Sequence, residues 1–195
     1  MMQRMKKFVL TVCFSLLIVS KMIYAGNPPF MEVQNQWADS ILSKMTLDEK
    51  IGQLLMITSR PLAGDKQQQN FIEAIEKYKI GGILFLKSNP TELAILANEY
   101  QKASKTPLFI ALDGENGLSF RMDSTIVYPN MIALGALNND SLLYRMGREV
   151  GQQCRILGIN LNFAPVADVN SNPENPVINY RSFGENPQRV SQKCM

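Results

Sequence analysis

Short apolar runs in this chain end abruptly in polar loops. Gly81–Leu86 and Pro107–Leu112 show no alternation of apolar with polar side chains, and Asp113 follows the second run directly. A later run, Leu161–Ala167, gives way to Asp168 in the same manner. Continuous apolar runs of this length are typical of parallel strands that are buried on both faces. Strands with polar residues at their carboxyl ends are how a parallel α/β barrel builds a site.

Segments with helical periodicity separate these runs. Apolar residues recur at three- and four-residue intervals in four segments, namely Asn35–Met45, Gln67–Tyr78, Thr91–Ala103 and Ser141–Leu157. The last segment is followed by Gly158, a residue typical of helix ends. The sequence Thr46-Leu-Asp-Glu49 has the pattern of a capping box, and it predicts a short helix that leads into a first strand at Leu54–Ile57.

This alternation of helices with buried strands predicts an α/β fold with a parallel sheet. At this level an open doubly wound sheet and a (β/α)8 barrel fit equally well. No Gly-x-Gly-x-x-Gly motif follows any of the runs, so a dinucleotide-binding site is not expected. A complete barrel takes about 250 residues, and about four βα units are expected here, which is half of a barrel.

Composition narrows the chemistry available to the chain. It contains no histidine and no Cys/His cluster with metal-binding spacing, so neither a metal nor another cofactor is expected. The formal net charge is +3, partly from basic residues at the extreme N-terminus, and no basic face for a nucleic acid is expected.

Cys154 falls on the apolar stripe of its helical segment, which favours a buried free thiol over a disulfide with Cys194.

The N-terminus has the pattern of an export signal. Three basic residues precede the apolar run Phe8–Val19, and Ala25 provides a small residue before a cut at Gly26. The apolar run is shorter than the about 20 residues that span a bilayer. We therefore expect residues 1–25 to be a signal peptide, and the remainder to be periplasmic or secreted with no membrane attachment after cleavage. A retained anchor is the alternative.

Three polar residues are candidates for a binding site. Asp113 would stand at the end of a strand, where a carboxylate can accept hydrogen bonds from two adjacent hydroxyls of a sugar; the alternative is an acid that caps a turn. Arg181 offers a planar fork suited to carboxylates or vicinal hydroxyls, unless it is a surface charge or the partner of Glu185. Arg121 could return to the same face, or be a solvated loop residue.

Two other patterns are weaker. Asp113 and Glu115 could be the reacting pair of a retaining glycosidase, but such carboxyls lie about 5 Å apart on opposite sides of the substrate. Two acids of one tight loop seldom straddle a ring in this way. The segment that starts at Asp168 imitates the opening of a calcium loop, yet Pro173 replaces its required glycine and Asn179 its terminal glutamate, so no metal site is expected.

Taken in order, five segments resemble successive signatures of glycoside hydrolase family 3. They are Met45–Gln53, Gly81–Ile83, Leu112–Glu115, Asn162–Asp168 and Arg181–Pro187. The resemblance covers nearly all of the chain after Gly26. The stretch Asn-Tyr-Arg-Ser-Phe around Arg181 is similar to the β-N-acetylglucosaminidase branch, whereas the β-glucosidase branch usually carries Pro-Arg-Trp-Gly-Arg. Residues 26–195 would then be the N-terminal portion of a family 3 TIM barrel.

The resemblance also implies an activity and a role for each candidate. The complete protein would be a retaining hydrolase that removes β-linked N-acetylglucosamine from glycans or cell-wall fragments, with carbohydrate as its partner. Asp113 would bind the outer hydroxyls of the sugar, Arg181 would contact the same subsite, and Arg121 would lie beside the binding loop. The family's histidine general acid and aspartate nucleophile have no counterpart before Met195, so the catalytic residues are expected downstream of it.

Three alternatives stay open at this stage. The chain could belong to a β-glucosidase-type enzyme of the same family, or be a non-catalytic sugar-binding remnant. It could also be an unrelated exported α/β binding protein. As part of a family 3 β-N-acetylglucosaminidase, the 195 residues would supply part of the sugar-binding floor, and alone they would show no turnover. The sequence does not indicate an oligomeric state.

Overall fold

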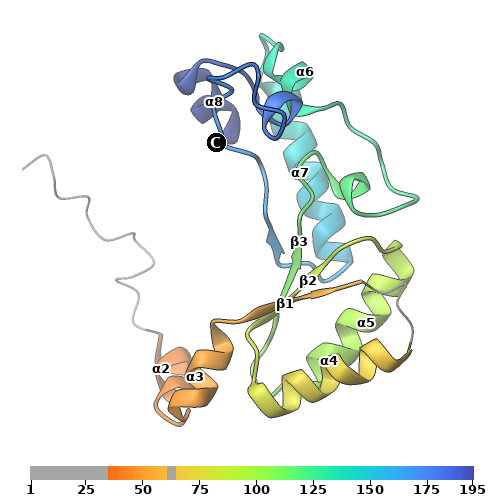
Figure 1. Ribbon diagram of the computed structural model, residues 1–195, viewed down its shortest axis with the longest axis vertical. Coiled ribbons are helices and arrows are strands. Elements are labelled where there is room, and N and C mark those ends of the chain that lie inside the picture. The colour runs from red at the N-terminus through yellow and green to blue at the C-terminus, as the bar shows by residue number, and fades with distance from the viewer. Residues whose placement is uncertain (1–34, 61–64) are drawn as a thin grey trace, which may run out of the picture. The chain divides into compact units, whose positions relative to one another are not determined.

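The computed structural model describes residues 35–60 and 65–195 (Figure 1). The expected signal peptide, residues 1–25, lies outside the described residues. The chain divides into two compact units, Met1–Lys44 and Met45–Met195. In the first unit the described residues form helix α2, Gln36–Leu42, whose N-terminus is capped by the Asn35 side chain. The helix predicted there is confirmed, and it ends three residues before the predicted boundary at Met45.

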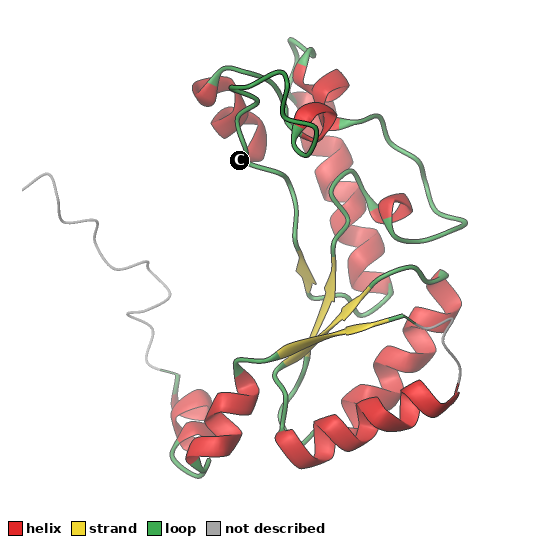
Figure 2. Cartoon of the chain, viewed as in Figure 1, coloured by secondary structure: helices red, strands yellow, loops and turns green. Residues whose placement is uncertain are grey.

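A four-stranded parallel sheet forms the centre of the second unit (Figure 2). Its strands are β1 Met56–Ser59, β2 Gly82–Phe85, β3 Phe109–Leu112 and β4 Leu161–Asn162. The spatial order β1-β2-β3-β4 follows the order in the sequence, and every pairing is parallel. A doubly wound sheet reverses its strand order near the middle, whereas a barrel adds each strand beside the last. The sheet therefore has the topology of the first half of a barrel.

Helices connect the strands, and α3 begins after the predicted capping residue Thr46. Their bounds are α3 Leu47–Gln53, α4 Asp65–Tyr78, α5 Pro90–Ala103, α6 Met131–Gly135, α7 Ser141–Ile156 and α8 Pro187–Cys194, with single 3₁₀ turns at η3 Leu118–Phe120 and η4 Asn179–Arg181. The capping box of Thr46 and Glu49 is present in full. Gly158 follows α7 with a φ of 74°, the left-handed conformation that glycine adopts most readily.

One face of the sheet is covered by α4, α5 and α7. Register pairs Ile83 with Ile110 and Phe85 with Leu112, so these four side chains share one face, and none is exposed to solvent. They form a single apolar cluster with side chains from the three helices: Phe71, Ile75, Leu93, Leu96, Ala97, Tyr100, Val150 and Cys154. The three helices therefore lie on the side of the sheet that is the outer side of a barrel.

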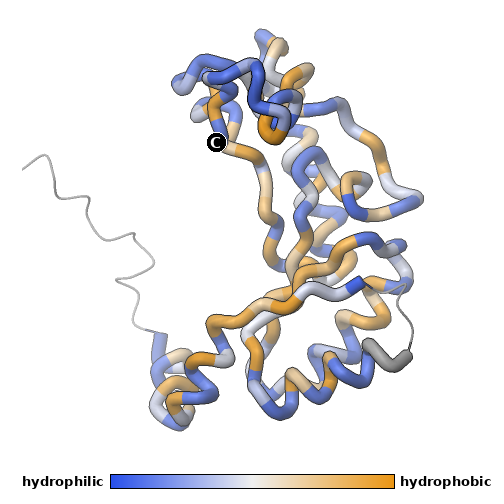
Figure 3. The backbone as a smooth tube through the Cα atoms, viewed as in Figure 1, coloured by the Kyte–Doolittle hydropathy of each residue, from blue (hydrophilic) through white to orange (hydrophobic). Residues whose placement is uncertain are grey.

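The opposite face of the sheet is partly open. Phe109 of β3 is 56% exposed, and Thr58 of β1 is also exposed, although Ala111 is fully buried. The prediction that the strand in Pro107–Leu112 is buried on both faces is therefore wrong at Phe109 of β3. The central strands β2 and β3 consist of apolar residues and glycine (Figure 3), and in a closed barrel this inner face is covered by side chains of the other strands. Among the described residues a single layer of helices covers only the outer face.

Two strand boundaries also differ from the predictions. The first strand begins at Met56 rather than Leu54, because Leu54 still caps the end of α3. The predicted strand Leu161–Ala167 is reduced to Leu161–Asn162. Its neighbour β3 ends at Leu112, whose carbonyl accepts a last hydrogen bond from Phe163. Beyond that point the chain has no ladder partner among the described strands, and Pro165 has no N–H to donate.

An ion pair between buried Lys193 and partly exposed Asp140 fixes α8 to the start of α7. The Lys193 ammonium, fully buried, donates to Asp140 Oδ1 at 2.7 Å and to the Leu137 carbonyl at 3.0 Å. Arg189 donates to the same carbonyl at 3.1 Å. The hydrogen bond from Lys193 is the largest influence that lowers the pKa of Asp140 below its ordinary value of 3.8.

The core assignment predicts a large difference between two neighbouring positions of α5. Leu93 is fully buried and Ile95 is 54% exposed. Leu93→Ala should lower the free energy of unfolding by about 2–5 kcal/mol, because it removes buried methylenes and leaves a cavity. Ile95→Ala, the matched control, should change it by about 0.5 kcal/mol or less. Urea unfolding measures both, and equal losses would contradict this packing of α5.

The Asp140–Lys193 pair predicts a specific response to acid. A carboxylate whose pKa is lowered in the folded state stabilises the fold above its unfolded pKa, and this contribution is lost as the pH falls through the lower folded value. Asp140→Asn should therefore reduce stability at pH 6, and the gap from the parent chain should narrow as the pH falls below about 4. Urea unfolding across this range tests it, with exposed Asp123→Asn as the control. A gap that stays constant would contradict the pairing.

Candidate functional site

The loop after β3 carries two carboxylates, and each is held by a different arginine. Arg121 donates from Nη2 to Asp113 Oδ2 and from Nε to the Asp113 carbonyl, the latter at 3.2 Å. Arg181 donates from Nε to Glu115 Oε2 at 2.9 Å and from Nη2 to Oε1 at 2.5 Å. Forked contacts between arginine and carboxylate are among the strong hydrogen bonds of proteins. The loop therefore carries its two negative charges in a fixed orientation.

Asp113 and Arg121 form the more open of the two pairs. Their side chains are 24% and 29% exposed, so the pair reaches solvent while both partners stay oriented. The Arg121 guanidinium also lies over the ring of Phe120, with 4.5 Å between its central carbon and the ring centroid. The sequence places both Asp113 and Arg121 among the candidates, and the structure brings them into direct contact.

Glu115 and Arg181 form the more buried pair. Glu115 is only 6% exposed, and its partner arrives from a segment 66 residues further along the chain. Arg181 also donates from Nη1 to the Val177 carbonyl at 3.0 Å. The alternative in which Arg181 pairs with Glu185 is wrong, since Glu185 is exposed and the ion pair forms with Glu115.

Three negative charges act on the Arg181 guanidinium. The pKa of Arg181 is raised chiefly by its hydrogen bonds to Glu115, and the negative charges of Glu115, Asp113 and Asp168 add to this effect. The direct partner of Asp113 is Arg121, and the direct partner of Arg181 is Glu115. This arrangement can bind a neutral polar ligand such as a sugar, which presents both donors and acceptors.

The segment that carries Arg181 is fixed by its neighbours. Ser182 is fully buried, and its hydroxyl donates to the Asp168 carbonyl at 2.6 Å, which ties the segment to the loop after β4. On the other side, Gly135 of α6 lies directly against Phe183. A Cβ at position 135 would stand 1.8 Å from the Phe183 carbonyl oxygen, so only glycine allows this approach.

Asn162, the last residue of β4, contacts the carboxylate-bearing loop. Its Oδ1 accepts from the Gly114 N–H at 2.9 Å, and its Nδ2 donates to the Gly114 carbonyl at 3.4 Å. Asn162 is not among the candidates from the sequence, and Glu115 appears there only as half of a possible reacting pair with Asp113. A polar residue inside an apolar run, level with the end of the neighbouring strand, is the signal that could have identified Asn162.

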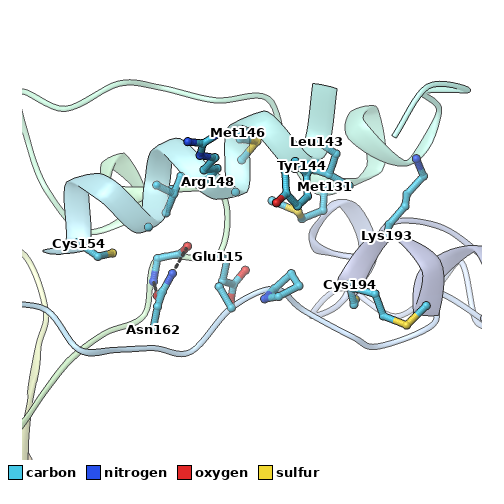
Figure 4. Close-up of a pocket in the computed structure, with 18 of the residues that line it drawn as sticks. Glu115, Met131, Leu143, Tyr144, Met146, Arg148, Cys154, Asn162, Lys193 and Cys194 are labelled. Carbon is cyan, nitrogen blue, oxygen red and sulfur yellow. Dashed lines mark hydrogen bonds between the residues drawn. The ribbon is translucent and has the colours of Figure 1, made fainter. Parts of the chain in front are cut away.

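A cavity lies between α7, β4 and α8 (Figure 4). It has a volume of about 900 Å³ and is lined by Glu115, Asn162 and Cys154 among others, but not by Asp113, Arg121 or Arg181. Cys154 is a buried free thiol, as predicted, and burial raises its pKa. The cavity runs along the outer side of β4, whose edge has no partner among the described strands. It adjoins the carboxylate-bearing loop at Gly114 and Glu115, although the Asp113 and Arg121 side chains do not line it.

The described part of the chain contains neither a cluster of metal-binding side chains nor a helix that could span a membrane. No three His, Cys, Asp or Glu side chains there are grouped so that they could hold a metal ion. Within residues 35–60 and 65–195, every helix is too short or too polar to cross a membrane.

Comparison with known proteins gives one matching family. The model of the glycosyl hydrolase family 3 N-terminal domain matches residues 46–194. A beta-hexosaminidase A from Pseudoalteromonas piscicida is 35% identical over 174 residues, which cover 76% of this chain and 29% of that protein.

Solved structures agree in fold with the chain. A family 3 beta-N-acetylglucosaminidase from Paenibacillus sp. has a TM-score of 0.68 and 35% identity, over 77% of this chain and 30% of that one. A beta-glucoside phosphorylase bound to 2FGlc has a TM-score of 0.76 and 25% identity, over 85% of this chain and 30% of that one. The chain thus spans about a third or less of the length of these proteins.

The ion pairs predict which of two glutamates matters for stability. Glu115→Gln replaces an acceptor-only carboxylate beside Arg181 with an amide that also donates, so the free energy of unfolding should fall by about 1–3 kcal/mol. Glu185→Gln should leave it within about 0.5 kcal/mol, because that side chain is exposed. Urea unfolding of the two variants decides between Glu115 and Glu185 as the partner of Arg181, and the reverse order of losses would overturn the assignment.

Proposed function

The chain belongs to glycosyl hydrolase family 3, and we propose that it forms the sugar-binding N-terminal part of a retaining β-N-acetylglucosaminidase. The observation that carries this proposal is the Asp113–Arg121 pair. Its carboxylate stands at the carboxyl end of β3, partly exposed and oriented by Arg121. The carboxyl ends of the strands are where barrels place their active sites.

The geometry of the pair suits a sugar. Arg121 binds Asp113 Oδ2, so Oδ1 is left to accept from ligand hydroxyls, and no described side chain donates to it. Arg181 uses Nε and Nη2 for Glu115 and Nη1 for the Val177 carbonyl, yet its side chain is 31% exposed. The guanidinium group as a whole carries five N–H donors, which is more than these contacts use. In the proposal, Asp113 accepts from the outer hydroxyls and Arg181 donates within the same subsite.

Higher sequence identity to proteins named for N-acetylated sugars favours N-acetylglucosamine over glucose as the sugar. The chain is 35% identical to proteins named as a hexosaminidase and an N-acetylglucosaminidase, but 25% identical to the beta-glucoside phosphorylase. The Asn-Tyr-Arg-Ser-Phe stretch at Arg181 points the same way. The higher TM-score of the phosphorylase, 0.76, supports the second candidate, a β-glucoside-acting enzyme of the same family.

In this proposal the chain contributes binding groups and not reacting groups. A retaining mechanism needs a nucleophile and a general acid on opposite sides of the scissile bond. Asp113 and Glu115 come from one loop, and each is bound by an arginine. We propose that both reacting residues lie outside this sequence and that the 195 residues alone do not hydrolyse an aryl β-N-acetylglucosaminide. We propose further that residues 1–25 direct export of the protein.

The proposal predicts that the chain binds N-acetylglucosamine through Asp113. Titration followed by amide NMR should shift the Glu115 and Ser182 resonances, and glucose should bind more weakly. Asp113→Ala should weaken binding by roughly 10- to 150-fold, because a hydrogen bond to a charged group contributes about 1.5–3 kcal/mol. The exposed carboxylate of Asp123, ten residues further on, is the matched control, and Asp123→Ala should bind as the parent chain does.

Other outcomes separate the candidates. Tighter binding of glucose than of N-acetylglucosamine would favour the β-glucoside enzyme. Binding of neither sugar, or equal binding by Asp113→Ala and the parent chain, would contradict the proposed role of Asp113.

A further inference from the structure

Gly114 lies between Asp113 and Glu115, which carry the two carboxylates of the site. The Asn162 side chain contacts the peptide groups on both sides of Gly114. Its N–H belongs to the peptide plane that also carries the Asp113 carbonyl, and this N–H donates to Asn162 Oδ1 at 2.9 Å. Its carbonyl belongs to the next plane, which leads into Glu115, and it accepts from Asn162 Nδ2 at 3.4 Å. Asn162 therefore contacts the backbone on both sides of Gly114.

The first of these planes is fixed at its two ends by two different residues. The Asp113 carbonyl accepts from Arg121 Nε at 3.2 Å, and the Gly114 N–H on the other edge donates to Asn162. The second plane has an additional donor, because the Gly114 carbonyl also accepts from the Gly117 N–H at 3.1 Å. The Gly114 N–H has no acceptor other than Asn162 among the described residues. Asn162 and Arg121 therefore fix the orientation of the peptide plane between Asp113 and Gly114.

The strand ladder explains why a side chain is needed at this point. Backbone pairing of β3 with β4 ends at Leu112 and Asn162. Gly114 lies past that end, where no strand backbone is available to accept its N–H. The fit is close, since a Cβ on Gly114 would stand 3.3 Å from Asn162 Oδ1 and 3.1 Å from the Gly117 carbonyl oxygen. The Asn162 amide supplies one acceptor and one donor, as a strand peptide would.

We infer that Asn162 is a positioning residue, which fixes the Gly114 peptide and thereby aims the Asp113 carboxylate at the ligand. This inference rests on the proposed function. Asn162 is not assigned a ligand contact, because both of its polar atoms are used by Gly114. Small displacements of a binding group weaken recognition strongly; a shift of 1 Å can cost about 100-fold in an enzyme.

Asn160 is a matched control within the same strand region. Its Oδ1 accepts from the Ile110 N–H at 2.9 Å, and its Nδ2 donates to the Leu108 carbonyl at 3.2 Å. Asn160 thus makes the same two kinds of contact as Asn162, but at the beginning of β3 and away from the carboxylates. Removal of either side chain costs two hydrogen bonds to the backbone, yet only Asn162 touches the site loop.

The experiment compares Asn162→Ala with Asn160→Ala in the full chain. Both should lose similar stability in urea. Only Asn162→Ala should bind N-acetylglucosamine more weakly, by about tenfold or more. It alone should also speed hydrogen exchange at the Gly114 amide and shift the Arg121 Nε–H resonance, which reports the contact with the Asp113 carbonyl. Asn162→Asp, which keeps the acceptor for the Gly114 N–H, should restore both signals toward those of the parent chain.

The outcomes are distinguishable from a failure of the proposed function. If the parent chain does not bind the sugar, the proposed function fails, and the Gly114 and Arg121 resonances still test the positioning role. Unchanged resonances in Asn162→Ala, or equal loss of affinity in Asn160→Ala, would overturn the role. Should Asn162→Ala not fold, Asn162→Leu and Asn160→Leu repeat the comparison with apolar side chains of similar size.

Discussion

The structure around the site depends on the need to hold two like charges on one short loop. Asp113 and Glu115 are separated by a single residue, and each is neutralised by its own arginine. Arg121 comes from the same loop, but Arg181 must be brought back across 66 residues of chain. A buried carboxylate without a partner is strongly unfavourable, so Glu115 requires Arg181 beside it. Much of the chain between the two residues serves to place Arg181 there.

The return path uses both the sheet and the small helices. Helix α7 packs on the outer face of the sheet through Val150 and Cys154, and it delivers the chain to β4 beside β3. After β4, the buried Ser182 hydroxyl and the close approach of Gly135 to Phe183 fix the segment that carries Arg181. The site is therefore assembled by backbone pairing, one serine and one glycine, with the two ion pairs formed on that frame.

Local signals in the sequence predicted most of the fold, and non-local contacts account for the rest. The capping box of Thr46 and Glu49 acts within one turn, so the start of α3 was predictable. The length of β4 was not, because it depends on where β3 ends. The candidates Asp113 and Arg121 form one ion pair, but a sequence does not reveal that Arg181 selects Glu115 over the nearer Glu185. Asn162 was missed because its contact with Gly114 depends on the register between β3 and β4.

The geometry also bears on the division of labour within a family 3 enzyme. A barrel site is built by loops from several strands, and the loops after β3 and β4 supply a sugar with contacts from one side only. Hydrolysis with retention requires carboxyls about 5 Å apart that flank the bond. Asp113 and Glu115 leave one loop and are each bound by an arginine, so neither has the position or the freedom for that role. In the proposed function, the residues of this chain therefore orient a sugar, and the reacting groups are side chains that approach it from the other side.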